Sequence, residues 1–143
     1  MQKTGGGRGR TARRERAVAE VQNQLAGLYR SFVAWASLYG DVDDRDERDR
    51  RDRVSRLSRE LSNGYLARSM WLGEGTRKKI EAFIEKSENL YSEFCADVEE
   101  RGYTRARTGM TARVSRRLGP LRKEIESDLR AEPEPTPRWR LRR

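Results

Sequence analysis

The side chains of this chain that could do chemistry are mostly cations. Its 143 residues include 32 Lys and Arg against 23 Asp and Glu, a formal net charge of +9, and 27 of the cations are Arg. His is absent and Cys occurs once. This composition excludes a histidine general base, a Cys/His couple, a zinc-finger ligand set and an internal disulfide. We therefore predict that the chain is not an enzyme and has no catalytic residue, metal site, cofactor or small-molecule substrate.

The stretch at residues 73–79, Gly-Glu-Gly-Thr-Arg-Lys-Lys, superficially suggests a phosphate loop. It lacks the GxxxxGK[ST] spacing and a preceding strand, so it does not indicate a nucleotide hydrolase. Its cations Arg77, Lys78 and Lys79 would lie in a first helical turn, where the helix dipole favours anions. A phosphate or an acidic group docked on the free backbone amides would make these cations favourable. The alternative is a simple solvated turn between two helices.

A second basic segment, residues 101–123, holds eight cations and no acid. Four of its cations fall within one sector of the expected helix, away from the apolar stripe: Arg105, Arg113, Arg116 and Lys123. Such a face can neutralise a phosphate backbone, although no aromatic residues are interleaved there to stack on bases. The alternative is a solvated basic face that pairs with residues 74–100, whose net charge is −4.

The acidic residues and the cysteine offer no reactive site. Residues 41–53 hold seven acids and five Arg, but a calcium loop needs Gly at its sixth position, and none is present there. Six acid-before-Arg pairs at i,i+4 spacing predict a solvated helix instead. They are Asp41-Arg45, Asp44-Arg48, Asp46-Arg50, Glu47-Arg51, Asp49-Arg53 and Asp52-Arg56. The carboxylates at Glu81, Glu85, Glu88, Glu93 and Glu100 form no ferritin-like site, because that site needs Glu-x-x-His. Cys95 lies at the edge of an apolar stripe, which predicts a half-buried, inert thiol.

Apolar residues recur at helical spacing in four segments, and no segment alternates as a strand does. We therefore predict an all-α fold, an antiparallel helical bundle of about four helices. Gly73 and Gly75 separate the second segment from the third, which stops at Gly102, and Gly119-Pro120 predicts a kink or a short break in the fourth. The predicted stripes are Val18, Val21, Leu25, Leu28, Phe32, Trp35 and Tyr39; Val54, Leu57, Leu61, Tyr65 and Leu66; Ile80, Phe83, Ile84, Leu90, Tyr91, Phe94 and Val98; and Met110, Val114, Leu118, Leu121, Ile125 and Leu129.

The first predicted helix is apolar over more of its circumference than packing along one line of contact requires. Its spacing follows a heptad repeat, and the flanking positions carry no charge that would select a partner. Either the helix lies at the centre of its own bundle, or another chain covers part of it. The possible partner interface comprises Val33, Trp35, Leu38 and Tyr39, and Trp35 is buried in both cases.

Composition divides the chain into three regions. Residues 1–16 are rich in Arg and Gly and predict a flexible basic arm, residues 17–131 the helical bundle, and residues 132–143 a Pro-rich and then basic tail. The longest apolar stretch, residues 32–39, is too short to cross a bilayer. Because the beginning of the chain lacks the pattern of a signal peptide, we expect a cytoplasmic protein.

Part of the chain, residues 65–130, resembles a known type of domain. The residues that carry the resemblance are mostly bundle-core positions: Leu66, Trp71-Leu72, Lys79-Ile80-Glu81-Ala82-Phe83-Ile84, Leu90-Tyr91-Ser92-Glu93-Phe94, Gly119-Pro120-Leu121 and Glu124-Ile125. They resemble small helical domains of uncharacterised bacterial proteins, in which the domain often follows a membrane segment or a coiled coil. The resemblance implies a helical fold and carries over no functional residue. The chain departs from the pattern by an Arg-rich arm in place of a membrane anchor.

These features together predict a non-enzymatic helical interaction module. It would self-associate or dock on a protein partner, while its basic arms provide electrostatic attachment. The alternative is a sequence-nonspecific nucleic-acid-binding protein. Salt distinguishes the two hypotheses, because nucleic-acid binding should collapse as salt rises whereas apolar docking should persist.

Overall fold

The structure is a computed structural model that describes residues 2–38 and 43–131. Over these residues every regular element is helical and no strand occurs, which confirms the predicted all-α class. The elements are α1 (Gln2–Ala36), α2 (Asp44–Arg68), the 3-10 turn η1 (Ser69–Trp71), α3 (Glu74–Arg101), α4 (Tyr103–Ala106) and α5 (Met110–Ala131).

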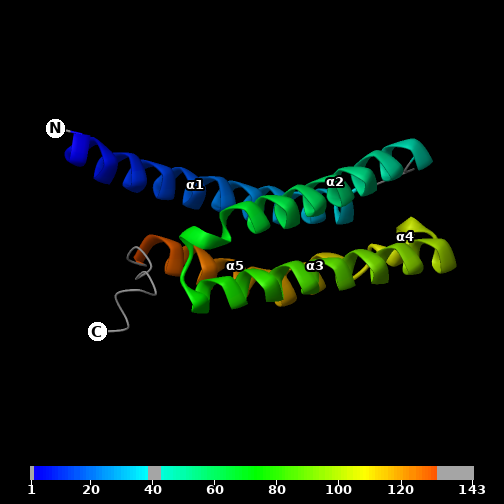
Figure 1. Cartoon of the computed structure of the whole chain (residues 1–143). Coiled ribbons are helices and arrows are strands. Elements are labelled where there is room, and N and C mark those ends of the chain that lie inside the picture. The colour runs from blue at the N-terminus through cyan, green and yellow to red at the C-terminus, as the bar shows by residue number, and fades with distance from the viewer. Residues whose placement is uncertain (1, 39–42, 132–143) are drawn as a thin grey trace.

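The long helices lie in two layers, with α1 and α2 in one and α3 and α5 in the other (Figure 1). Helix α1 packs against both α2 and α5, and α3 packs against both α5 and α2. Trp35 of α1 joins the layers, because its ring centroid lies 4.2 Å from that of Phe94 and 5.6 Å from that of Tyr91, both on α3. Aromatic pairs at such separations contribute beyond the area they bury.

The core that the apolar stripes predict is confirmed at most of its positions. Each long helix contributes fully buried side chains, among them Val21, Leu25, Leu28, Phe32, Trp35, Val54, Leu61, Ile80, Phe83, Leu90, Phe94, Met110, Val114, Leu118 and Ile125. Leu66 is the exception, since 74% of its surface is exposed, and the prediction for it is wrong. Successive helical residues point about 100° apart, so when Tyr65 takes the core position its neighbour faces outward.

The ends of the helices follow local backbone chemistry. Asp43 caps α2, because its carboxylate accepts a hydrogen bond from the amide of Arg45 at 3.0 Å. Helix α3 ends at Gly102, as predicted, where φ is +81°. Gly109 has a φ of +80° and separates α4 from α5. The predicted fourth helical segment is therefore two helices, because only glycine adopts this backbone region without strain.

The beginning of the chain differs from the flexible arm that the sequence predicts. Helix α1 starts at Gln2, so it includes most of residues 1–16, and Figure 1 shows it extending past the end of α2. The physical reason is cooperativity, because adding residues to an existing helix costs far less than nucleating a new one. The many Arg residues and Ala12 are good helix formers and offset the glycines. The predicted tail, residues 132–143, lies outside the described residues.

Pro120 lies in the middle of α5 without ending it. Of the two alternatives predicted at Gly119-Pro120, a kink or a short break, the break is wrong, since the helix runs from Met110 to Ala131, and the kink stays a prediction. Proline removes one backbone hydrogen bond and crowds the preceding turn. The fully buried side chains of Leu118 and Ile125 on either side anchor both halves of α5 in the core and offset that cost.

Candidate anion-binding surface

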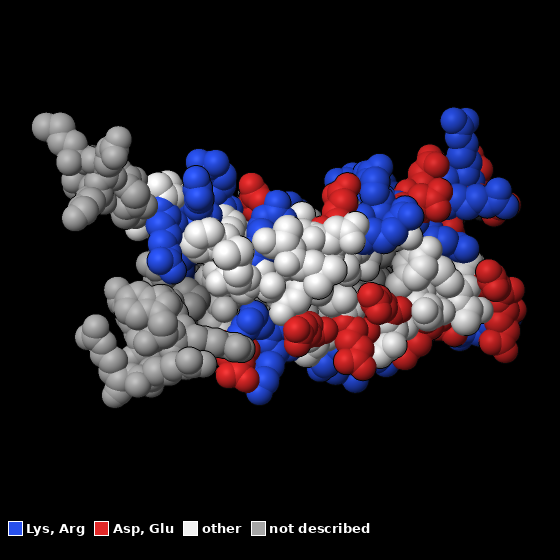
Figure 2. All heavy atoms as spheres, in the orientation of Figure 1, with Lys and Arg blue, Asp and Glu red and all other residues white. Residues whose placement is uncertain are grey.

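Charge is distributed unequally over the two layers. Figure 2 shows Lys and Arg gathered along the α1 and α2 side of the molecule, and carboxylates gathered along the α3 side. The anion-binding residues that the sequence predicts lie on α3, α4 and α5. A cation that already forms an ion pair with a carboxylate of the chain is less available to an anion.

The cations of α5 that face α3 form ion pairs with its carboxylates. Arg113 Nη1 lies 3.3 Å from Asp97 Oδ2 and 4.0 Å from Glu93 Oε2. Arg117 Nη1 donates to the same Glu93 oxygen at 2.7 Å. Two carboxylates four residues apart on α3 therefore neutralise two arginines four residues apart on α5, as the alternative prediction for this segment requires.

The other predicted cations of this segment do not share one helix. Arg105 lies on α4, which Gly109 separates from α5, whereas Arg116 and Lys123 lie on α5. All three side chains are exposed. Arg116 lines a shallow depression of about 290 Å³ together with Arg113 and Arg117, so it is the one predicted cation that the structure places beside Arg113.

The predicted cations at the start of α3 are largely committed to neighbouring carboxylates. Gly73 is the N-cap of α3, which confirms that this stretch opens a helix. Lys78 Nζ lies 3.5 Å from Glu74 Oε1, and Lys79 Nζ donates to Asp128 Oδ2 at 2.8 Å. The hydrogen bond to Asp128 raises the pKa of Lys79. Arg77 is half-buried. An anion docked there would compete with Glu74 and Asp128.

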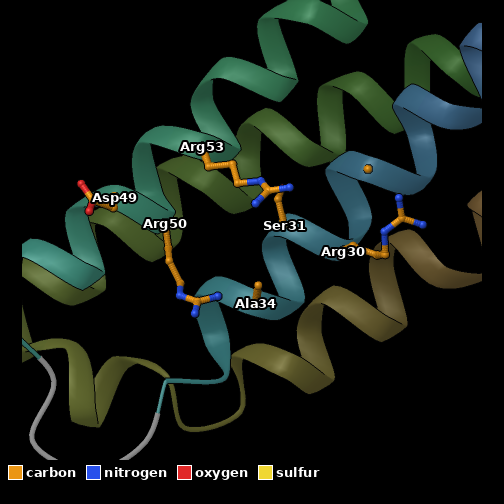
Figure 3. Close-up of a pocket in the computed structure, with 7 residues that line it drawn as sticks. Arg30, Ser31, Ala34, Asp49, Arg50 and Arg53 are labelled. Carbon is orange, nitrogen blue, oxygen red and sulfur yellow. The ribbon is translucent and has the colours of Figure 1, made fainter.

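A different group of arginines lines a pocket of about 360 Å³ between α1 and α2. Arg30 comes from α1, while Arg50 and Arg53 come from α2, and all three are exposed (Figure 3). None of the three forms an ion pair with a carboxylate among the residues that the structure describes. The floor is made by Gly27, Ser31 and Ala34, whose small size leaves the space open.

These three arginines are not among the anion-binding residues predicted from the sequence. It assigns Arg50 and Arg53 to i,i+4 pairs with Asp46 and Asp49, but in the structure the pair of this kind that forms beside them is Glu47 with Arg51. Two signals were available. Arg30 is the one cation in residues 17–40, and Arg50 and Arg53 are spaced to share a helix face.

Glu47 and Arg51 of α2 form a partly buried ion pair. Glu47 is 4% exposed, and the Arg51 guanidinium lies 6.0 Å from the centroid of the Trp35 ring. Burial acts to lower the pKa of Arg51, but the hydrogen bond to Glu47 and the attraction of nearby acidic groups together outweigh it, so the pKa is raised overall. Arg51 thus engages one carboxylate oxygen of Glu47 within α2.

The remaining potentially reactive groups have structural surroundings. Cys95 is a half-buried free thiol, as predicted, and burial raises its pKa, so the reactive thiolate is disfavoured. Glu81 accepts a hydrogen bond from the Tyr65 hydroxyl at 2.8 Å. No cluster of three or more carboxylate, Cys or His side chains suited to a metal ion occurs within the described parts of the chain.

The predicted partner interface falls mostly inside the chain's own core. Trp35 has no exposed surface, and Val33 and Leu38 are half-buried and pack against the same core. Tyr103 holds the end of α1, since its hydroxyl donates to the Trp35 carbonyl and accepts from the Leu38 amide at 3.0 Å. Tyr39 lies outside the described residues. Among the residues that the structure describes, the large exposed apolar side chains are instead Leu66 and Met70.

Comparison with known proteins adds no relative: no family model, no curated protein and no solved structure matches the chain. The resemblance to small bacterial helical domains stays a prediction. Among the helices described, none combines the length and the apolar composition that crossing a membrane requires.

Proposed function

We propose that this chain is a non-enzymatic helical interaction module that attaches to polyanions, a nucleic-acid backbone first among them. The observation that carries the proposal is the group of arginines between α1 and α2, which lack ion-pair partners among the described residues. Arginine presents a planar fork of donors that matches a phosphate group. A cytoplasmic location, where such polyanions are abundant, belongs to the same proposal.

The recognition would be independent of base sequence. Contacts from Arg to phosphate position a protein on a nucleic acid but carry no sequence information. The aromatic side chains of α1 and α2 that the structure describes, Tyr29, Phe32, Trp35 and Tyr65, are buried or half-buried, so they offer no platform on which bases could stack. We also infer that the four long helices form the antiparallel bundle expected from the sequence, and the packing of α1 on α2 and α5 supports this.

The test is fluorescence anisotropy of the full chain with two labelled DNA duplexes of unrelated sequence, over a range of salt concentrations. Equal affinity for both duplexes is expected. Affinity should also fall about 100-fold over a fourfold rise in salt if about four phosphates are contacted, because each contact contributes a slope of about 0.9. Undetectable binding at low salt, or binding that salt does not weaken, would overturn the proposal.

A second copy of this chain is the second candidate partner. The observation that favours it is the pair Leu66 and Met70, four residues apart and 74% and 71% exposed. Leu66 lies in the last turn of α2 and Met70 in the adjacent η1, and exposed apolar patches are typical of association surfaces. Sedimentation of the wild type and of a Leu66→Gln, Met70→Gln variant tests it. A salt-resistant dimer that the variant dissociates is expected, and a wild-type monomer at every concentration excludes this candidate.

A further inference from the structure

The pocket between α1 and α2 has the chemistry of a discrete phosphate site. Three guanidinium groups and one carboxylate, that of Asp49, line its wall, so its local formal charge is positive. In Figure 3 the guanidinium group of Arg53 lies beside Ser31 and that of Arg50 beside Ala34, whereas the carboxylate of Asp49 lies away from both. The guanidinium groups of Arg50 and Arg53 thus come from α2 and lie along α1, while that of Arg30, on α1, lies apart from them in the same view.

The polar group on the floor of the pocket does not serve as a donor. The Ser31 hydroxyl donates to the Leu28 carbonyl at 2.7 Å, so its proton is already engaged. Binding of an anion would thus depend on Arg30, Arg50 and Arg53. A Cβ atom added at Gly27 would meet no heavy atom within 4 Å, so a larger side chain at this position would project into open space.

The sequence explains why these arginines have no internal partner. Glu20 of α1 pairs with Arg68 near the end of α2, but residues 21–40 contain no Asp or Glu, so the part of α1 that lines the pocket supplies no carboxylate. An arginine that turns from α2 toward α1 meets Gly27, Ser31 and Ala34 instead. A tetrahedral oxyanion matches such a set, because each guanidinium can direct two parallel N–H donors at one phosphate.

We propose that this pocket binds a phosphate group through Arg30, Arg50 and Arg53. The inference rests on the proposed function, since it names the place where a phosphodiester of the nucleic-acid backbone is seated. The same chemistry fits a free oligophosphate. Asp49 limits the affinity of the pocket, because its negative charge opposes the bound anion.

The probe for the pocket is inorganic pyrophosphate, titrated into the full chain by calorimetry. The Arg50→Gln, Arg53→Gln variant should lose about tenfold or more in pyrophosphate affinity, given what charge-assisted hydrogen bonds contribute. The matched control is Arg116→Gln, Lys123→Gln, which removes the same charge from exposed positions on α5 and should change affinity less than about twofold. Equal losses in both variants would overturn the site.

Two further variants separate the pocket from general electrostatics. Gly27→Leu fills the space without changing any charge, and it should abolish pyrophosphate binding while circular dichroism shows the fold retained. Asp49→Asn should tighten binding a few-fold. Full binding by Gly27→Leu, or weaker binding by Asp49→Asn, would contradict the proposal.

The DNA duplexes used above distinguish the source of the phosphate. Pyrophosphate binding together with DNA binding that Gly27→Leu weakens supports a backbone phosphate in the pocket. Pyrophosphate binding without DNA binding supports the pocket, assigns it to free oligophosphates and overturns the proposed function. DNA binding without pyrophosphate binding, unchanged in Gly27→Leu, leaves the proposed function standing and overturns the pocket.

Discussion

The two layers of the molecule use similar arginines in opposite ways. On the α3 and α5 layer, Glu93 and Asp97 meet Arg113 and Arg117 across the helix interface, so these two arginines of the basic segment are neutralised within the fold. On the α1 and α2 layer, Arg50 and Arg53 face a helix with no carboxylate between residues 21 and 40. The difference shows that a count of cations along a segment does not measure the charge available to a partner. What matters is whether the neighbouring helix presents acids at matching positions.

If the two layers fold as one unit, Trp35→Ala should have the largest effect on stability. Trp35 has no exposed surface and contacts Phe94 and Tyr91 of the opposite layer. Replacing it should lower the free energy of unfolding by about 3–5 kcal/mol, because a large cavity is left. Chemical denaturation followed by circular dichroism should show one cooperative transition at much lower denaturant.

Leu66→Ala is the matched control for the core substitution. Its side chain is 74% exposed, so its loss should change the free energy of unfolding by less than about 0.5 kcal/mol. Two separate transitions in the Trp35→Ala variant would show that the layers fold independently. The difference between their arginines would then be a difference between two separate folding units.

The second test uses the hydrogen bond that joins the layers at Tyr65. Burial and the hydrogen bond to Glu81 of α3 raise the pKa of Tyr65 to about 12. In the unfolded chain the tyrosine pKa is about 10. The protonated form is therefore favoured by folding, so this stabilisation is complete below pH 10 and is lost as pH rises from 10 to 12.

Denaturation midpoints measured between pH 9 and about 12 check this sign. The wild type should lose about 2 kcal/mol of stability across that interval from this group, at about 1.4 kcal/mol per pKa unit. Tyr65→Phe should start about 1 kcal/mol less stable at neutral pH and show a correspondingly smaller loss at high pH. The same slope in both proteins would place the pH dependence elsewhere.

The third test contrasts the two arginine groups directly by charge reversal. Arg113→Glu, Arg117→Glu places two acids against Glu93 and Asp97 and should lower the free energy of unfolding by about 1–2 kcal/mol. Arg50→Glu, Arg53→Glu breaks no ion pair among the described residues and should leave stability within about 0.5 kcal/mol. Its affinity for a DNA duplex should fall more steeply than that of the α5 variant.

Equal changes in stability and in DNA affinity in the two charge-reversal variants would contradict this difference between the layers. If both lose stability alike and both lose DNA affinity alike, the α5 ion pairs are not specific and the arginines of α1 and α2 are not more available. Measuring stability and affinity on the same preparations keeps these two readouts separate.

Periodicity predicts the helical part of this fold because burial itself sets the pattern. The stripe from Val18 to Trp35 is buried as predicted, since a 3-4 spacing puts these side chains on one face whatever their partners. Helix ends are harder to place. Gly102 ends α3 as expected, but the turn at Gly109 depends on a φ of +80° that a spacing argument does not register.

The candidate site was less predictable, because it depends on pairing between helices. The sequence shows that residues 101–123 are basic and that residues 74–100 are acidic, and it leaves open whether they meet. It also assigns Arg50 and Arg53 to partners on their own helix. Which of two possible neighbours an arginine contacts is decided by the packing of α2 on α1, which local spacing does not determine.

The smallest expected effect belongs to Lys78→Gln, at the start of α3. Lys78 and Glu74 are four residues apart with side chains 74% and 76% exposed, and such i,i+4 pairs contribute about 0.3–0.5 kcal/mol. The variant should therefore change the free energy of unfolding by no more than that, and DNA affinity by less than about twofold. If the first turn of α3 were the anion site, affinity would instead fall as strongly as in the Arg50→Glu, Arg53→Glu variant. Anisotropy titrations of both variants at one salt concentration decide between these places, because a contact made by the α3 turn cannot be replaced by arginines on the other layer.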